Sequence, residues 1–240
     1  MNVLSLFDGM SCGQIALERA VIEVDRYYAS EIEKNAIKVT MANYPNTEQL
    51  GDVNNWEEWE LENIDLLIGG SPCQSLSIAQ SKTRTSLNGK SKLFFKFVDI
   101  LNELKPKWFL FENVASMNDE SKAIISSLLG CEPILINSNC FSAQDRPRLY
   151  WTNIPVELNN IKKNDIVLSD IMESEVDQSF FYNYEVDKID MSKQVCGTMI
   201  YKNHDMHKRI FNPMFKCHTL TTCGGGNKQK KVLDNGIPRN

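Results

Sequence analysis

Short apolar runs alternate with segments of helical periodicity through the first 150 residues of the chain. The runs from Asp65 to Gly69 and from Trp108 to Glu112 are nearly continuous in apolar residues, which is typical of strands buried on both faces. Strands are predicted at Val3 to Phe7, Arg26 to Ser30, Leu50 to Val53, Asp65 to Gly69, Trp108 to Glu112 and Pro133 to Asn137. Between the fourth and fifth, helical spacing predicts one buried stripe, formed by Leu93, Phe94, Phe97, Ile100, Leu101 and Leu104. The alternation predicts a doubly wound α/β domain.

The sequence changes character after about Asn153, where Asn, Asp, Lys and Ser dominate and hydrophobic periodicity weakens. We therefore predict a main domain at residues 1–153 and a small appended lobe at residues 154–240. A chain of 240 residues is long enough for both, since single α/β domains commonly reach about 200 residues.

The charge is distributed unevenly along the chain. The net charge is −5, yet residues 190–240 carry nine basic and only three acidic side chains. Lys228, Lys230 and Lys231 form the densest part of this basic stretch, and they are the predicted phosphate contacts if the lobe binds DNA. Composition alone fits a solvated basic tail as well as a polyanion-binding face.

The sequence gives no sign of disulfides, structural metal or membrane insertion. It has seven cysteines but no CxxC spacing, so neither a disulfide framework nor a zinc site is expected. The apolar runs are too short to span a bilayer, and the first residues lack the basic and apolar regions of a secretory signal. We expect a cytoplasmic protein without a metal.

A glycine-containing turn, Phe7-Asp-Gly-Met-Ser-Cys-Gly13, follows the first predicted strand. Glycines at such a turn let the backbone approach a ligand at the carboxyl edge of the sheet. Glu31 and Asp52 follow later strands, where carboxylates suit ribose hydroxyls and an adenine amino group. Each acid could instead cap a helix. The three features together predict a nucleoside-containing cofactor.

A second group of residues suggests covalent chemistry on a base. Cys73 lies in a small polar loop after the strand that ends at Gly69, which favours a reactive thiol over a buried structural one. A thiolate that attacks a pyrimidine at C6 needs a partner group at N3, and Glu112 ends the next strand. Arg146 and Arg148 then provide donors for a base or a phosphate.

These elements resemble, in order, the motifs of the DNA (cytosine-5)-methyltransferases. The matching elements are Phe7-Asp-Gly with Gly13, Glu31, Asp52-Val53, Pro72-Cys73-Gln74, Leu93-Phe94-Phe95, Glu112-Asn113-Val114, Gln144-x-Arg146-x-Arg148 and His218-Thr-Leu-Thr-Thr222. The match runs from about Asn2 to Thr222. Some stretches are similar to the animal de novo enzymes, while the compact chain favours a bacterial or phage member, including those of restriction-modification systems.

The resemblance implies a Rossmann-like domain that binds S-adenosyl-L-methionine and methylates C5 of cytosine in double-stranded DNA. It implies that Cys73 bonds to C6, that Glu112 engages N3 and the exocyclic amine, and that Arg146 and Arg148 hold the base. The target base must then be flipped out of the duplex. The implied cofactor site is Phe7, Asp8, Gly9, Gly13, Glu31, Asp52, Val53 and Leu93.

Three alternatives stay open in the sequence. A related tRNA cytosine-5 methyltransferase shares most motifs, but carries a second proline where this chain has Ser71. A thiol enzyme acting on free nucleotides would leave Glu31 and Asp52 unexplained. An inactive DNA-binding homologue is disfavoured by the intact motifs.

The family normally adds a final helical segment beside the cofactor turn, whereas this sequence ends 18 residues after Thr222. We therefore expect weak cofactor binding and little activity from the chain alone, which would be explained by a truncated gene or by a second polypeptide that supplies the missing segment.

Overall fold

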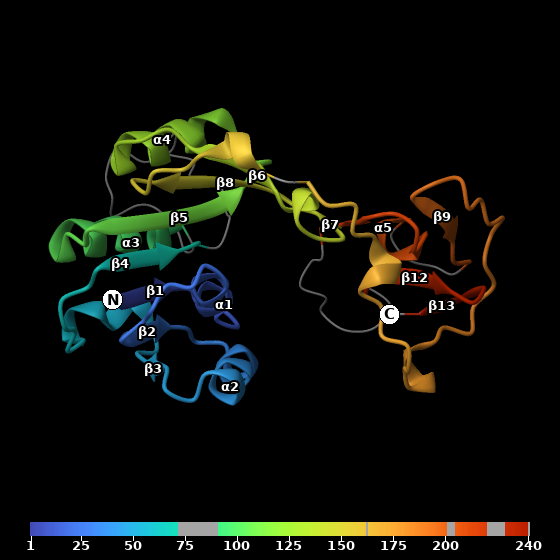
Figure 1. Ribbon diagram of the computed structural model, residues 1–240, viewed down its shortest axis with the longest axis horizontal. Coiled ribbons are helices and arrows are strands. Elements are labelled where there is room, and N and C mark those ends of the chain that lie inside the picture. Colours follow the sequence, from blue (N-terminus) through green and yellow to red (C-terminus); the bar gives the residue numbers. More distant parts are fainter. Residues whose placement is uncertain (72–90, 162, 201–204, 220–228, 240) are drawn as a thin grey trace. The chain divides into compact units, whose positions relative to one another are not determined.

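The computed structural model describes the chain except for residues 72–90, 162, 201–204, 220–228 and 240 (Figure 1). The described residues form two compact units. The first comprises Met1–Ile136 and Arg148–Val156, and the second comprises Asn137–Pro147 and Glu157–Asn240. The sequence suggested one boundary after residue 153, whereas the structure groups Asn137–Pro147 with the later residues, because this segment pairs with a strand at Cys217–His218.

A seven-stranded sheet forms the centre of the first unit, with the strand order β3-β2-β1-β4-β5-β8-β6. The strands are β1 (Asn2–Leu6), β2 (Arg26–Ser30), β3 (Glu48–Gln49), β4 (Leu66–Gly69), β5 (Trp108–Val114), β6 (Ile134–Asn137) and β8 (Pro147–Thr152). Strands β1 to β5 pair in parallel, and β8 pairs antiparallel with β5. The strand order reverses between β1 and β4, and ligands of such sheets bind at the carboxyl ends of the strands near that point.

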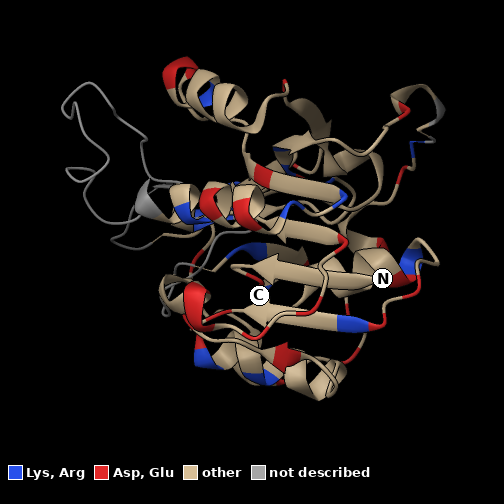
Figure 2. Cartoon of the chain, turned by 90° about the vertical axis from the view of Figure 1, so that its left-hand side faces the viewer, with Lys and Arg blue, Asp and Glu red and all other residues tan. Residues whose placement is uncertain are grey.

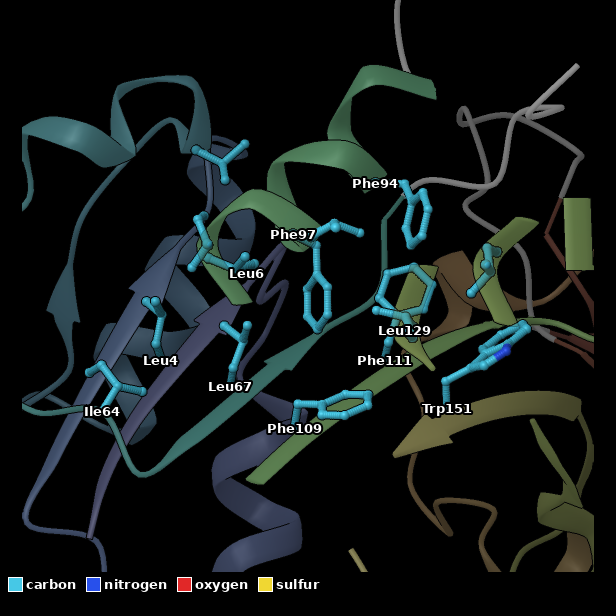
Figure 3. Close-up of a cluster of buried hydrophobic side chains, with 14 of the residues drawn as sticks. Leu4, Leu6, Ile64, Leu67, Phe94, Phe97, Phe109, Phe111, Leu129 and Trp151 are labelled. Carbon is cyan, nitrogen blue, oxygen red and sulfur yellow. The ribbon is translucent and has the colours of Figure 1, made fainter. Parts of the chain in front are cut away.

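Helices cover both faces of this sheet. They are α1 (Cys12–Arg19), α2 (Lys34–Asn43), α3 (Ser91–Leu104) and α4 (Asp119–Leu129), with a 3₁₀ helix at Val53–Glu58. On one face, Phe97 and Leu129 pack in the main core with Leu67 of β4 (Figure 3). On the other face, Leu17 of α1 packs with Val3. The strands are almost free of charged residues, which gather in helices, strand ends and loops (Figure 2). The predicted α/β class with a largely parallel sheet is confirmed.

Aromatic rings fill the core between α3 and the sheet. The ring centroid of Phe111 lies 4.9 Å from that of Phe97 and 5.2 Å from that of Phe94, distances at which tilted aromatic pairs attract. A Cβ added at Gly69 would lie only 2.8 Å from the Phe97 ring, so the end of β4 has room for glycine alone. The predicted helical stripe is confirmed, since Phe94, Phe97 and Ile100 are fully buried.

The strand predictions are right for most of the sheet, but they missed β8 and are wrong for the third strand. A strand was expected from Leu50 to Val53, but the third strand is two residues long, at Glu48–Gln49, and Val53 already begins the 3₁₀ helix. The side chain of Asp52 accepts a hydrogen bond from the backbone N–H of Asn54 and so caps this helix. The capping residue ends the extended segment earlier than its apolar residues suggested.

The second unit contains a four-stranded sheet in the order β13-β12-β10-β9. Its strands are β9 (Val195–Thr198), β10 (Arg209–Phe211), β12 (Lys231–Asp234) and β13 (Ile237–Arg239), and the unit also has the short pair β7 (Gln144–Asp145) and β11 (Cys217–His218) and helix α5 (Asp205–Lys208). Short 3₁₀ helices lie at Ser138–Cys140, Leu158–Asn160, Leu168–Asp170 and Gln178–Phe180. The sequence predicted no regular strands here, since these strands are short and weakly periodic.

Strands β12 and β13 form a β-hairpin near the chain end. Asn235 and Gly236 have φ values of +48° and +83°, as a two-residue turn between right-handed twisted strands requires. Pro238 lies in β13, an outer strand of the sheet, where a missing N–H is tolerated.

Within the described part of the chain, no helix has the length and apolar character needed to cross a membrane.

Candidate active site

The turn between β1 and α1 has an unusual backbone. Phe7, Gly9 and Ser11 all have left-handed φ values, of +59°, +62° and +59°. Phe7 and Ser11 are not glycines, so this conformation is strained and must be held by its surroundings. The backbone N–H of Asp8 donates to the carbonyl of Ser30 at 3.2 Å, and the Thr40 hydroxyl donates to the Gly9 carbonyl at 3.3 Å. The sequence indicated a glycine turn, but only the structure shows the strain at Phe7 and Ser11.

Glu31, at the end of β2, holds this turn from the side. One carboxylate oxygen accepts from the Gly9 N–H at 2.8 Å. The other accepts from the N–H groups of Ile32 and Glu33, both at 2.8 Å. Glu31 therefore joins the ends of two neighbouring strands at the edge where the sequence predicted a cofactor.

The other predicted cofactor residues divide between this edge and the interior. Asp52 is exposed and caps the 3₁₀ helix, which is the alternative that the sequence left open, and its Oδ1 also accepts from the Asn54 amide at 2.8 Å. Val53 is 4% exposed and belongs to the core, against which Leu93 also packs. A Cβ at Gly13 would lie 2.6 Å from the Tyr27 hydroxyl, so this glycine allows α1 to pack closely against β2.

The carboxylate of Asp8 is hydrogen-bonded to other side chains of the protein. Its Oδ1 accepts from the Tyr27 hydroxyl at 2.8 Å, and its Oδ2 accepts from the Ser11 hydroxyl. The Gln14 amide then donates to Ser11 Oγ at 3.2 Å and to Thr47 Oγ1 at 2.8 Å. Sequence reasoning missed Tyr27, and nothing in the local pattern distinguishes it from an ordinary strand aromatic.

Glu112 and Arg148 form an ion pair on adjacent antiparallel strands. Arg148 Nε lies 2.7 Å from Glu112 Oε1, and the side chains are 12% and 33% exposed respectively. Arg148 lies opposite Val114, two positions from Glu112 along β5, which brings the two side chains within reach of each other. The structure thus brings together two predicted catalytic residues that are far apart in the sequence.

The end of β4 lies against this ion pair. A Cβ at Gly70 would lie 3.0 Å from Glu112 Oε2 and 3.2 Å from the Glu112 carbonyl oxygen. Ser71 is buried, and its carbonyl accepts from the Asn113 amide at 3.4 Å. Cys73, the predicted nucleophile, lies in residues 72–90, outside the described part of the chain.

Arg146 belongs to the second unit, whereas Glu112 and Arg148 belong to the first. Its backbone N–H donates to Asn137 Oδ1 at 2.9 Å, and the Asn137 amide donates to Asp145 Oδ1 at 2.6 Å. The Thr219 hydroxyl donates to the Asp145 carbonyl at 2.8 Å. Two predicted motifs, Gln144-x-Arg146 and the start of His218-Thr-Leu-Thr-Thr222, therefore lie side by side, while Thr221 and Thr222 lie outside the described residues.

In the basic stretch at residues 190–240, two lysines direct their ammonium groups at backbone carbonyls. Lys231 is 1% exposed, and its Nζ donates to the carbonyls of His207 and Gln229 at 2.9 and 2.8 Å. The expectation that Lys231 contacts phosphate is therefore wrong, because its charge is enclosed by backbone carbonyls. Lys216 similarly donates to the carbonyls of three residues, Ser142, Asn164 and Ile166. Lys230 is partly exposed, and Lys228 lies outside the described residues.

The carboxyl edge of the sheet has an open face at the turn between β1 and α1. At Gly9 no atom lies within 4 Å of the position of an added Cβ, so the turn is open on that side. Glu31 supplies a carboxylate beside it, as ribose recognition requires. Among the residues that the structure describes, no group of three or more His, Cys, Asp or Glu side chains is arranged to hold a metal ion.

Comparison with known proteins agrees with this chemistry. The family model described as "C-5 cytosine-specific DNA methylase" matches residues 1–232. The orphan methyltransferase M.Rho11sI of Bacillus phage rho11s is 34% identical over 170 residues, covering 66% of this chain and 34% of the relative. M.SPRI of Bacillus phage SPR is also 34% identical over 170 residues, covering 66% of this chain and 38% of the relative.

A longer match extends over nearly the whole chain. The orphan methyltransferase M.SPBetaI of Bacillus phage SPbeta is 24% identical over 327 aligned positions, covering 98% of this chain and 74% of the relative. The chain thus spans about a third of the length of the first two relatives and three quarters of the third. Since the family model covers almost all of the sequence, the chain belongs to the C-5 cytosine-specific DNA methylase family.

Proposed function

We propose that this protein methylates C5 of cytosine in double-stranded DNA. The observation that carries the proposal is the ion pair of Glu112 and Arg148 at the carboxyl edge of the sheet, beside the end of β4 that leads to Cys73. Family membership supports the same reaction. The relatives come from Bacillus phages, which favours a bacterial or phage setting.

Cys73 acts as the nucleophile in this proposal. Its thiolate adds to C6 of the target base, and electron density moves toward N3 and C5. After C5 has been methylated, loss of the C5 proton and elimination at C6 restore the aromatic ring and free the thiol. The motif Pro72-Cys73-Gln74 supports this role, since the residue follows a buried strand at the same edge as Glu112.

Glu112 stabilises the ring while it carries extra charge. Its carboxyl group is one third exposed and so remains accessible to N3 and the exocyclic amine of a base. Arg148 is more buried and donates to Oε1, which fixes the orientation of the carboxylate and leaves Oε2 toward Gly70. Arg146 is proposed to hold the base. Because these groups cannot reach a stacked base, the target must be flipped out of the duplex.

S-adenosyl-L-methionine, when bound, supplies the methyl group. We propose that the open face of the turn at Phe7 and Gly9, together with Glu31, holds the nucleoside part of this cofactor. Asp52 has a second carboxylate oxygen for the adenine amine, since both contacts to Asn54 use Oδ1. The site is supported from the protein interior by the packing of Gly13, Val53 and Leu93.

Residues 154–240 are proposed to form the DNA-recognition lobe, and residues 1–153 the catalytic domain. The basic stretch at residues 190–240 supports contacts to phosphate, although buried lysines such as Lys231 do not take part. Of the three lysines that the sequence predicted to contact phosphate, Lys230 is described by the structure and remains a proposed contact.

Methyl transfer from labelled S-adenosyl-L-methionine to unmethylated bacterial genomic DNA tests the proposal. Digestion to nucleosides and mass spectrometry should find the label in 5-methylcytosine. Cys73→Ala should abolish incorporation, while Cys140→Ala, which removes the partly buried thiol of a different cysteine, should retain it. Label in another nucleoside, or full activity of Cys73→Ala, would contradict the proposed reaction.

A further inference from the structure

A partly buried carboxylate, that of Asp8, supports the strained turn between β1 and α1. Both oxygens of Asp8 accept hydrogen bonds from protein hydroxyls, those of Tyr27 and Ser11. Tyr27 is 4% exposed and Ser11 is fully buried, so water does not easily replace either donor. The Asp8 carboxylate is therefore engaged from inside the protein, while its backbone forms part of the turn.

Tyr27 is placed to reach Asp8 by the geometry of β2 and α1. It lies on the face of the sheet that α1 covers, and its hydroxyl fits into the space that Gly13 leaves in that helix. Burial, reinforced by the negative charge of Asp8, raises the pKa of the Tyr27 hydroxyl. The hydroxyl consequently stays protonated at neutral pH and donates to the carboxylate.

The turn needs such support because three of its five residues from Phe7 to Ser11 have left-handed backbones. Glu31, at the end of the neighbouring strand β2, holds the same turn by accepting a hydrogen bond from the Gly9 N–H. If Glu31 also takes up ribose hydroxyls, the inner support through Asp8 is the one that remains unchanged when a ligand binds.

We propose that Tyr27 is a positioning residue for cofactor binding, and that it acts by holding Asp8 and thereby the Phe7–Ser11 turn in its binding conformation. This inference rests on the proposed function. It also assigns Asp8 a supporting role through its side chain in place of direct contact with the cofactor.

Tyr27→Phe tests the role because it removes one hydroxyl and keeps the ring. Tyr28→Phe is the matched control, since Tyr28 is the next residue of β2, is fully buried, and receives only a 3.5 Å contact from the Glu62 N–H on its hydroxyl. Calorimetry on the full chain would give the dissociation constant for S-adenosyl-L-methionine, and steady-state methylation would give KM and kcat.

We expect Tyr27→Phe to raise the dissociation constant and the cofactor KM about tenfold, the scale of losing one hydrogen bond to a charged group. The kcat at saturating cofactor and the KM for DNA should change less than about twofold, on the uniform-binding pattern. Tyr28→Phe should leave the cofactor KM unchanged. Ser11→Ala removes the other donor to Asp8 and should raise the cofactor KM in the same way. It therefore tests the role even if Tyr27→Phe does not fold.

A double-mutant cycle separates support from direct contact. In an Asp8→Asn background, Tyr27→Phe should add less than about twofold to the dissociation constant, because both changes break one interaction. Additive effects, or cofactor binding by Tyr27→Phe equal to that of wild type, would refute the positioning role of Tyr27 but not the proposed function. If the wild-type chain did not bind S-adenosyl-L-methionine even weakly, the proposed function would be refuted, and this role with it.

Discussion

Replacing Glu112 by Gln should separate the chemistry of the site from its stability. Gln keeps an oxygen that accepts from Arg148 Nε, so the variant loses the negative charge and retains the contact. A hydrogen bond between charged partners exceeds a neutral one by about 1 kcal/mol, and Glu112 is one third exposed, which screens the difference. The free energy of unfolding should therefore fall by about 1 kcal/mol or less.

The catalytic loss should be larger. Removing a positioned acid or a donor that acts on the transition state typically lowers turnover about a hundredfold or more, which corresponds to about 2.7 kcal/mol in the barrier. Native proteins have about 5 to 15 kcal/mol of stability, so the variant should remain almost entirely folded. Lost folding cannot then account for lost turnover.

Single-turnover methylation and chemical denaturation of the same preparations measure the two effects. Glu48→Gln is the control, because Glu48 also pairs with an arginine, Arg26, at 2.7 Å, and the two glutamate side chains have comparable exposure, 40% and 33%. Glu48 lies on β3, at the edge of the sheet and away from β5. It should show a similar small stability change and normal turnover. Turnover of Glu112→Gln within about threefold of wild type, or an equal loss in Glu48→Gln, would refute the assignment of Glu112.

Three further predictions concern stability and ionisation. Val21 is 89% exposed with a φ of +55° in the turn that ends α1, so Val21→Gly should raise the free energy of unfolding by about 1 kcal/mol in chemical denaturation, and destabilisation would contradict this. Lys231→Met should lower the unfolding free energy by about 1 to 3 kcal/mol, because two carbonyls lose their donor, while leaving the salt dependence of DNA binding unchanged, and a flatter salt slope would return Lys231 to the DNA interface. Hydrogen bonds from Ser192 and the nearby Lys193 lower the pKa of Asp190 to about 2. The ionised carboxylate therefore stabilises the fold at pH values above the pKa that Asp190 has in the unfolded chain, and this contribution is lost as the pH falls toward 2. Carboxyl NMR titration should show this midpoint and its rise in Ser192→Ala, and an unchanged midpoint in the variant would exclude the hydroxyl as the cause.

The sequence predicted the elements whose residues face one uniform environment. Strands such as Trp108–Val114 and the stripe around Phe97 are apolar because both sides of the sheet are covered, and that pattern is visible without coordinates. The strand Pro147–Thr152 was missed as a strand, since it is short and its alternation of Leu149 and Trp151 is brief. Its antiparallel pairing with β5 is what brings Arg148 to Glu112.

The supporting residues of the site were beyond sequence reasoning for a physical reason. Tyr27 and Asn137 act through hydrogen bonds to residues that are close only in the folded chain. Lys231 carries a charge that normally indicates the surface, and only its enclosure by carbonyls identifies it as internal. Residue type and spacing therefore indicated the chemistry, while the contacts that position it required the structure.

The most direct test of the central claim is to trap the covalent intermediate. DNA amplified with 5-fluorocytosine in place of cytosine presents many possible sites, and fluorine at C5 cannot leave as a proton does. Incubation with S-adenosyl-L-methionine, followed by proteolysis and mass spectrometry, should give one adduct, on the peptide that contains Cys73. No adduct, or an adduct of equal yield in Cys73→Ala, would contradict the proposed covalent methylation of cytosine.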